Sequence, residues 1–281
     1  MAIKSHRVKN LKPFRKLSYG CWENATEASI YGTEEYSCLE VQNFLDRYNK
    51  FHNTKLTTTH LIIKLVAQVI QKHPSLNRYF RLFSIYQREK VSCMVLVNLP
   101  DKSIDDYDLD FVRIEDVNSL SLENIRIHLA NETNNRRSYQ GNEFWFVRFF
   151  STLIPLILIK PLFKLYSFLN YGLNLNLKFL GLPNDIAGSF ILSNLAQFHI
   201  LEGRVPLIEN SRCPIIITMG EIRNGPTVIN NQLVIAPLIK ITVTLDHRLI
   251  DASQGALIFK CLKKMFDAPN SVFTEGSVEN S

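Results

Sequence analysis

The chain has 281 residues, of which 46% are hydrophobic and 21% are charged. This composition is ordinary for a globular protein with a substantial core, and it excludes disorder as the main state. The net charge of +6 suits an anionic partner, or simply a scattered basic surface. Basic residues cluster at most in pairs such as Arg136-Arg137, without interleaved aromatic residues, so no nucleic-acid groove is predicted.

The five cysteines are odd in number, widely spaced and without a CxxC pair. This pattern predicts neither a disulfide framework nor a metal site. The first 16 residues lack an apolar signal core, and the chain has no phosphate-binding glycine loop and no HExxH motif. We expect a reducing, cytoplasmic location, with peripheral contact to a membrane left open.

The N-terminal half alternates between helical and extended patterns. Apolar residues at helical spacing predict helices over 39–51, 60–72 and 119–135, the second stopped by His73-Pro74. VSCMVLVNLP, at 91–100, predicts a buried strand. The acidic run at 101–110 lacks the spacing of a calcium loop and is predicted to be solvated.

The segment from about 144 to 182 is unusually apolar. Its longest apolar run covers 149–159, too short to span a bilayer, which needs about 20 residues. A helical insertion is predicted, with Pro155 and Pro161 breaking or starting its turns. We expect it to pack on the protein and line the substrate channel, and a weak membrane-surface contact is the alternative.

After Gly188 the chain becomes rich in strands. The segments 189–195, 213–222 and 232–245 are predicted strands, and 253–266 is a helix with one apolar face. The residues from about 270 are predicted to form a flexible tail.

His247 stands at the end of an alternating strand, LIKITVTLDHR, on the same parity as the apolar residues. Its ring is expected to point inward, where burial favours the neutral imidazole that a general base requires. Asp251 follows four residues later, just before the last helix. His60, His73 and His199 are expected to be structural.

DHRLIDASQGA resembles the HxxxDG motif of the acyltransferase (E2) catalytic domain of 2-oxoacid dehydrogenase complexes, whose fold is shared with chloramphenicol acetyltransferase. GSFILSNLAQFHI, CPIIITMGEI, the N-terminal FRKL and the helix pair ending in KHPSLN resemble the same family in the same order. The resemblance covers about 14–269 and implies an α/β (α+β sandwich) fold, a mixed sheet flanked by helices, in one catalytic domain over 1–281.

The resemblance also implies roles for particular residues. His247 matches the histidine that takes the acceptor's proton, and Ser193 the serine that donates to the oxyanion of the tetrahedral intermediate. Asp251 matches the aspartate that supports the histidine loop, and Arg15 an arginine that pairs with it. Coenzyme A or acyl-CoA is the implied co-substrate, with a thiol or hydroxyl acceptor. The residues that bind the cofactor are not identified.

The resemblance further implies a homotrimer in which the histidine of one subunit faces the serine of its neighbour. The chain begins almost at the catalytic domain, so no bound lipoyl group is expected in it. Ala196 and Ala252 replace glycines of the motifs, and a positive φ at Ala252 would shift the backbone. Two alternatives stay open: a non-catalytic E2-like trimeric scaffold that binds partners, and a membrane-associated acyltransferase with a lipid acceptor.

Overall fold

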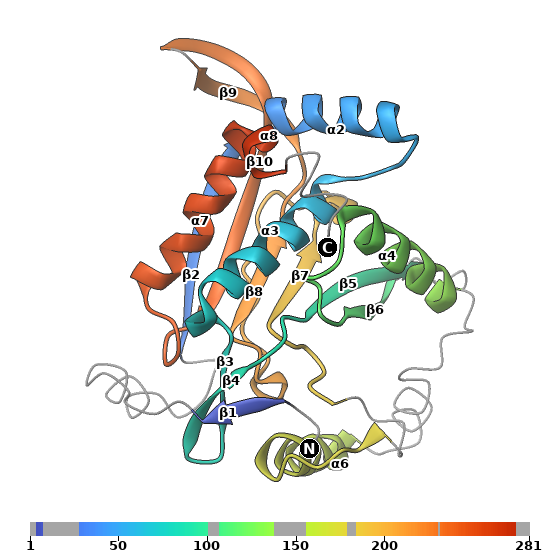
Figure 1. Cartoon of the computed structure of the whole chain (residues 1–281), viewed down its shortest axis with the longest axis vertical. Helices are drawn as coiled ribbons and strands as arrows, with labels where there is room; N and C mark the ends of the chain where they lie inside the picture. The colour runs from blue at the N-terminus through green and yellow to red at the C-terminus, as the bar shows by residue number, and fades with distance from the viewer. Residues whose placement is uncertain are drawn as a thin grey trace.

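The computed structural model describes residues 4–7, 28–100, 107–137, 156–178, 184–229 and 231–273 (Figure 1). Its centre is a seven-stranded mixed sheet in the order β2-β10-β8-β7-β5-β6, with β9 paired to β10. The strands are β2 (Ser29–Ser37), β5 (Cys93–Pro100), β6 (Tyr107–Ile114), β7 (Phe190–Asn194), β8 (Ile215–Met219), β9 (Arg223–Ile229) and β10 (Gln232–Asp246). β7 runs parallel to both β5 and β8, whereas β10 is antiparallel to all its partners.

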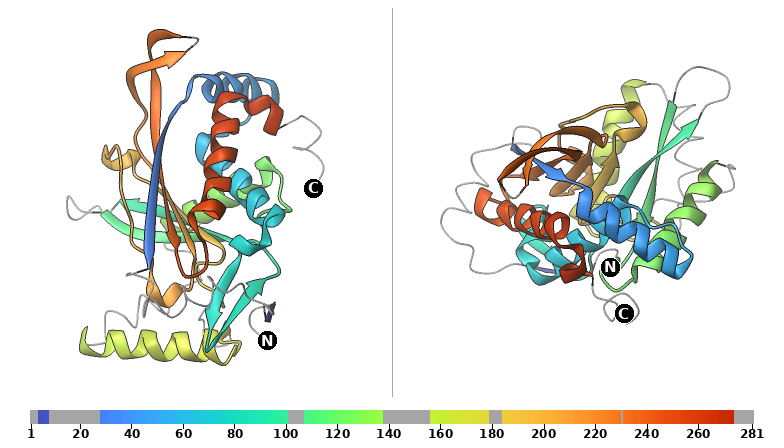
Figure 2. Two further views of the ribbon diagram at one scale, coloured as in Figure 1. Left: turned by 90° about the vertical axis from the view of Figure 1, so that its left-hand side faces the viewer. Right: turned by 90° about the horizontal axis from the view of Figure 1, so that it is seen from above.

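Helices cover one face of this sheet (Figure 2). They are α2 (Leu39–His52), α3 (Thr58–Lys72), α4 (Leu122–Arg137) and α7 (Ala252–Asp267). The buried face of α3 meets α7 and the strands in the main core, where Ile62, Val66 and Ile70 are fully buried. The predicted mixed sheet flanked by helices is therefore confirmed.

The opposite face of the sheet is also buried, but a loop covers it. Ile191, Ile216 and Met94 form a second core cluster with Leu207 and Cys213 from that loop. Thr244 lies on this face and donates its hydroxyl to the carbonyl of Val205 over 2.8 Å. Thr242 and Thr244 of β10 are therefore both buried, because the Thr33 hydroxyl on β2 and the Val205 carbonyl of the loop provide their hydrogen-bond partners.

A small second sheet lies at the end of the molecule where β10 terminates. It has the order β1-β4-β3, from β1 (Ser5–Arg7), β3 (Arg78–Arg81) and β4 (Ser84–Arg88). β3 and β4 form a tight hairpin with Leu82 and Phe83 at its tip. α3 leads to β3 through a short 3-10 turn, η1 (Pro74–Leu76).

The apolar insertion contains α6 (Leu156–Ser167), which continues into a π-helical turn, η2 (Phe168–Gly172). Pro161 lies inside α6, so the prediction that it breaks the helix is wrong, while Pro155 lies outside the described residues. Tyr166, Ser167 and the η2 turn face the domain.

The prediction that this helix packs on the protein holds only for that side. Leu162, Phe163 and Leu165 are all exposed. The physical reason is that apolar residues occupy every side of α6, and one side alone can meet the domain.

A buried ion pair of the domain lies against the insertion. The guanidinium of Arg88 binds both carboxylate oxygens of Asp185, at 2.7 and 2.8 Å, and stacks on the ring of Tyr79. Tyr171 of η2 donates to the same carboxylate and to the carbonyl of Ser211. Burial raises the pKa of Asp185, but the guanidinium outweighs it and holds that pKa below its ordinary value.

Two further predictions from the sequence need correction. The acidic run Asp101–Asp110 is predicted to be a solvated loop, yet its second half begins β6, and Asp110 is buried with its carboxylate on the backbone N–H of Phe111. The alternation of acidic with apolar residues there is that of a strand. The tail predicted from about 270 begins instead with α8 (Pro269–Val272), and Phe273 packs against Phe44. Residues after 273 lie outside the described part.

The N-terminus of α3 provides a test of stability against pH. The backbone N–H of Thr57 donates to Nδ1 of His60 over 2.9 Å, which requires an unprotonated ring nitrogen. Burial, then the nearby Arg126, lowers the pKa of His60 from 6.5 to about 4. The unfolded chain thus binds more protons between these values, and the free energy of unfolding is expected to fall as pH falls through that window.

His60→Gln should flatten this slope, because a glutamine oxygen can accept the same bond without titrating. Urea unfolding of both proteins at several pH values between 4 and 7 measures the effect. An unchanged slope in the variant would show that His60 does not cause the pH dependence.

Candidate active site

The DHRLID turn connects β10 to α7. β10 ends at Asp246, whose backbone carbonyl accepts from the N–H groups of Leu249 and Ile250. The backbone N–H of His247 donates to the carbonyl of Ala28 over 2.8 Å. The turn is therefore fixed both within itself and to the start of β2, and His247 lies at a strand end as predicted.

The His247 ring is half-buried, and its Nδ1 lies 3.2 Å from the carbonyl oxygen of Ile250. A carbonyl can only accept, so Nδ1 carries the proton in this contact. In the neutral ring the lone pair then resides on Nε2. An Nε2 with a lone pair can accept a proton.

An ion pair inside the turn supports the histidine. Both carboxylate oxygens of Asp246 accept from the guanidinium of Arg248, at 3.0 and 2.8 Å, and both side chains are buried. The Arg248 guanidinium also lies 4.7 Å from the centre of the Phe80 ring on β3. Asp246 and Arg248 thus hold the turn on either side of His247. They were not identified from the sequence, although an acidic and a basic residue flanking the histidine could have indicated the pair.

Asp251 caps α7. Its Oδ1 accepts from the backbone N–H of Gln254 over 3.0 Å and from the hydroxyl of Ser253 over 2.6 Å, and Gln254 bonds back to the Asp251 N–H. Asp251 thus supports the histidine loop by fixing the start of the next helix. Arg15, its predicted partner, lies outside the described residues.

Neither glycine-to-alanine departure strains the backbone. Ala252 is the first residue of α7, and Ala196 begins a 3-10 turn, η4 (Ala196–Phe198). Neither is among the described residues with positive φ. The backbone shift considered for Ala252 does not occur, because a helical φ suits alanine.

Ser193 lies in β7 and is 7% exposed. In the sheet register, Ser193 pairs with Thr218, Thr218 with Thr242, and Thr242 with Thr33. The result is a row of four hydroxyl side chains across the sheet, which the sequence pattern did not reveal. Thr33 bonds to Thr242 over 2.9 Å and donates to Glu202, which lowers the pKa of that carboxyl.

The same register separates Ser193 from His247. Ser193 lies in line with Thr242, two strands away, and His247 follows Thr242 by five positions. With about 3.4 Å per residue and about 4.8 Å between strands, the two are on the order of 20 Å apart. Their side chains also belong to opposite faces of the sheet. Ser193 is two positions after Ile191, which packs on the loop-covered face, and His247 is two positions after Leu245, which packs in the main core.

The other singled-out histidines have structural positions. His60 bonds to the N-terminus of α3, His73 ends that helix, and His199 adopts positive φ and bonds to Glu221 over 2.7 Å. Among the described residues, no three His, Cys, Asp or Glu side chains are grouped as metal ligands would be. None of the helices described has the length and apolar character to cross a bilayer.

This fold is that of the E2 catalytic core and of chloramphenicol acetyltransferase. The cubic core of the pyruvate dehydrogenase multienzyme complex has a TM-score of 0.61 at 16% identity, covering 94% of this chain and 93% of that one. A probable dihydrolipoamide acetyltransferase from Listeria monocytogenes has 0.59 at 12% identity, covering 96% and 97%. A chloramphenicol acetyltransferase has 0.54 at 11% identity, covering 93% and 99%.

The sequence of the C-terminal third agrees with this class. Residues 182–274 match the model of the 2-oxoacid dehydrogenases acyltransferase (catalytic domain) family. This confirms the resemblance for the three motifs in that range, whereas FRKL and KHPSLN lie outside the match. Over 93 residues, 33% of this chain, the identity is 29% to the dihydrolipoyllysine-residue succinyltransferase component of the 2-oxoglutarate dehydrogenase complex of Saccharomyces cerevisiae, of which 20% is covered.

A second relative is the dihydrolipoyllysine-residue acetyltransferase component of the pyruvate dehydrogenase complex of Rickettsia felis. It is 29% identical over 82 residues, which is 29% of this chain and 19% of that protein. The chain thus matches about a fifth of the length of these relatives. The residues matched by the family model, 182–274, include Ser193, His247 and Asp251.

The ion pair in the turn provides a second test. Arg248→Met leaves the buried Asp246 carboxylate without its partner and is expected to lower the free energy of unfolding by about 3–5 kcal/mol. The double variant Asp246→Asn/Arg248→Met removes both charges and should recover most of that loss. Lys263→Ala, which breaks an exposed pair with Asp267, is the control, with a change under about 1 kcal/mol. Denaturant unfolding measures all three, and an equal effect of Arg248→Met and Lys263→Ala would contradict the assignment.

Proposed function

We propose that this protein is an acyltransferase that moves an acyl group between coenzyme A and a thiol or hydroxyl acceptor. The observation that carries the proposal is the Nδ1 contact of His247 with the Ile250 carbonyl. It directs the lone pair of the neutral ring to Nε2, in a turn that matches the acyltransferase family model. A dihydrolipoamide acetyltransferase from Azotobacter vinelandii has been studied for the catalytic role of a serine, a histidine and an asparagine, the last two four positions apart like His247 and Asp251.

In the proposed reaction, Nε2 of His247 takes the proton from the S–H or O–H group of the acceptor. The acceptor sulfur or oxygen attacks the thioester carbonyl carbon of acyl-CoA at the same time. The carbonyl oxygen becomes an oxyanion, to which the hydroxyl of Ser193 donates a hydrogen bond. The C–S bond then breaks, and the leaving thiolate of coenzyme A takes the proton back from His247. Asp246, Arg248 and Asp251 position the turn without touching the reacting atoms.

We further propose that the active unit is a homotrimer with its sites between subunits. The support is the distance on the order of 20 Å between Ser193 and His247 that the sheet register gives within one chain. One proton transfer and one oxyanion bond cannot act on the same tetrahedral carbon across that distance. His247 of one subunit and Ser193 of the next would complete each site.

Incubation with a panel of acyl-CoAs and candidate acceptors, dihydrolipoamide among them, tests the activity. Free coenzyme A and acylated acceptor are separated by chromatography. His247→Ala is expected to lower the rate at least ~100-fold, and Ser193→Ala about as much through the lost oxyanion bond. Far-ultraviolet circular dichroism controls for folding. Near-full turnover in both variants would contradict the mechanism.

Mixing the two inactive variants tests the shared site. If His247→Ala and Ser193→Ala subunits assemble randomly in equal amounts, about a quarter of the interfaces combine an intact histidine with an intact serine. The mixture, refolded together, should therefore regain about a quarter of the wild-type rate, whereas each variant refolded alone stays inactive. No recovery in mixed oligomers would place both groups in one chain, and full activity of a stable monomer in sedimentation would refute the trimer.

A further inference from the structure

The insertion and the β3–β4 hairpin together form an exposed apolar surface. On α6, the side chains of Leu158, Leu162, Phe163 and Leu165 are exposed. On the hairpin, Leu82 is 52% exposed and Phe83 is 89% exposed. We call α6, η2 and this hairpin tip the platform. Apolar surface of this extent on a soluble protein marks an interaction site.

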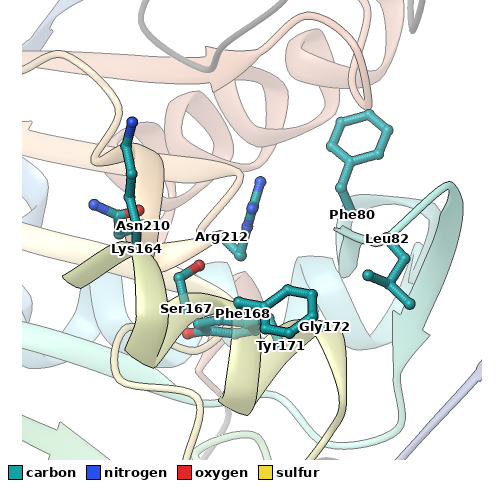
Figure 3. Close-up of a pocket in the computed structure, with 9 residues that line it drawn as sticks. All are labelled: Phe80, Leu82, Lys164, Ser167, Phe168, Tyr171, Gly172, Asn210 and Arg212. Carbon is teal, nitrogen blue, oxygen red and sulfur yellow. The ribbon is translucent and has the colours of Figure 1, made fainter. Parts of the chain in front are cut away.

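The two parts of the platform are held together. Arg81 of β3 donates its Nε to the carbonyl of Gly172 over 3.2 Å. Phe80 and Leu82 face Ser167, Phe168 and Tyr171 across a pocket of about 270 Å³ (Figure 3). In Figure 1 and in the left view of Figure 2, α6 lies at the same end of the molecule as the β3–β4 hairpin. The platform is therefore one continuous end surface.

The charge of this surface is of one sign. Neither 156–178 nor 78–88 contains an acidic residue, while these two segments contain three lysines and, apart from the buried Arg88 that pairs with Asp185, two arginines. Lys164 and Lys178 are exposed beside the apolar side chains, and Lys164 and Arg212 line the pocket. An anionic partner complements this surface. A second copy of the same surface does not, because its cations would meet like charges.

The composition of α6 favours a surface contact over insertion across a bilayer. Lys160 and Lys164 interrupt its apolar run, and none of the described helices is long and apolar enough to cross a bilayer. Leucine and phenylalanine exposed beside lysines are the composition of a helix that lies in the plane of a bilayer surface.

We propose that the platform docks this protein on the surface of an anionic lipid bilayer. α6 lies in the interface, Phe83 and Leu82 insert at the hairpin tip, and the lysines contact lipid phosphates. This docking places the β10–α7 turn at the membrane-facing end, because Phe80 of the same hairpin contacts Arg248 beside His247. The position of the turn bears on the substrate, a step that rests on the proposed function. An acceptor or acyl chain held in the membrane is then the substrate class of the site.

Vesicle co-sedimentation of the full chain tests the docking. We expect binding to phosphatidylcholine vesicles that contain roughly 30% phosphatidylglycerol, and at least ~5-fold weaker binding to phosphatidylcholine alone or on raising salt from about 0.1 to about 0.5 M. Leu162→Gln/Phe163→Gln should lower the binding at least ~10-fold. Leu82→Asn/Phe83→Ser tests the hairpin separately, and asparagine tolerates the positive φ of residue 82.

The matched control replaces a leucine and a phenylalanine exposed on α2, which lies at the other end of the molecule (Figure 1). Leu39→Gln/Phe51→Gln should leave vesicle binding within ~2-fold of wild type. Thermal unfolding of each variant confirms that it is folded. His247→Ala should bind vesicles like wild type, so loss of chemistry and loss of docking are read separately.

Three results would overturn the proposal. The first is wild-type protein that stays in the supernatant with anionic vesicles. The second is an equal loss of binding in the platform and α2 variants. The third is a smaller oligomer for the platform variants when sedimented without lipid, which would identify this surface as a contact between copies of the chain.

Discussion

Hydrogen bonding among β7, β8 and β10 is the constraint on which the rest of the site depends. The parallel pairing of β7 with β8 and the antiparallel pairing of β8 with β10 leave one register, in which Ser193 is in line with Thr242. A slip of one residue would turn every side chain of a strand to the other face and expose the two cores. The positions of Ser193 and His247 are therefore a consequence of core packing on both faces of the sheet.

Two buried ion pairs stabilise the end of the molecule beyond this sheet. Asp246 and Arg248 hold the turn that carries His247, and Arg88 of β4 pairs with Asp185, whose carboxylate also accepts from Tyr171 of the insertion. Each guanidinium also stacks on an aromatic ring of β3, Phe80 for Arg248 and Tyr79 for Arg88. The short strand β3 thus contacts both the turn that carries His247 and the Arg88–Asp185 pair, through adjacent residues.

The sequence predicted the elements whose patterns are local. β10 and α7 followed from periodicity, whereas the N-cap at Asp251 became visible only in the structure. The sequence did not reveal the hydroxyl row, because Thr33, Thr218 and Thr242 come together only through strand register. The buried start of β6 was mistaken for a loop because acidic residues hid its alternation. The exposure of α6 could not be predicted either, since an apolar pattern does not specify whether protein or another medium covers it.

The distance between Ser193 and His247 in one chain has a consequence for regulation. On the proposed mechanism, a newly made chain can be fully folded and still be inactive, because its His247 and its Ser193 each need the other group from a neighbouring subunit. Specific activity then depends on the concentration of subunits, rising steeply where assembly begins. A subunit that lacks only His247 would disable one interface, while its own Ser193 would still serve the other, so the activity of mixed trimers would fall in proportion to the share of variant chains.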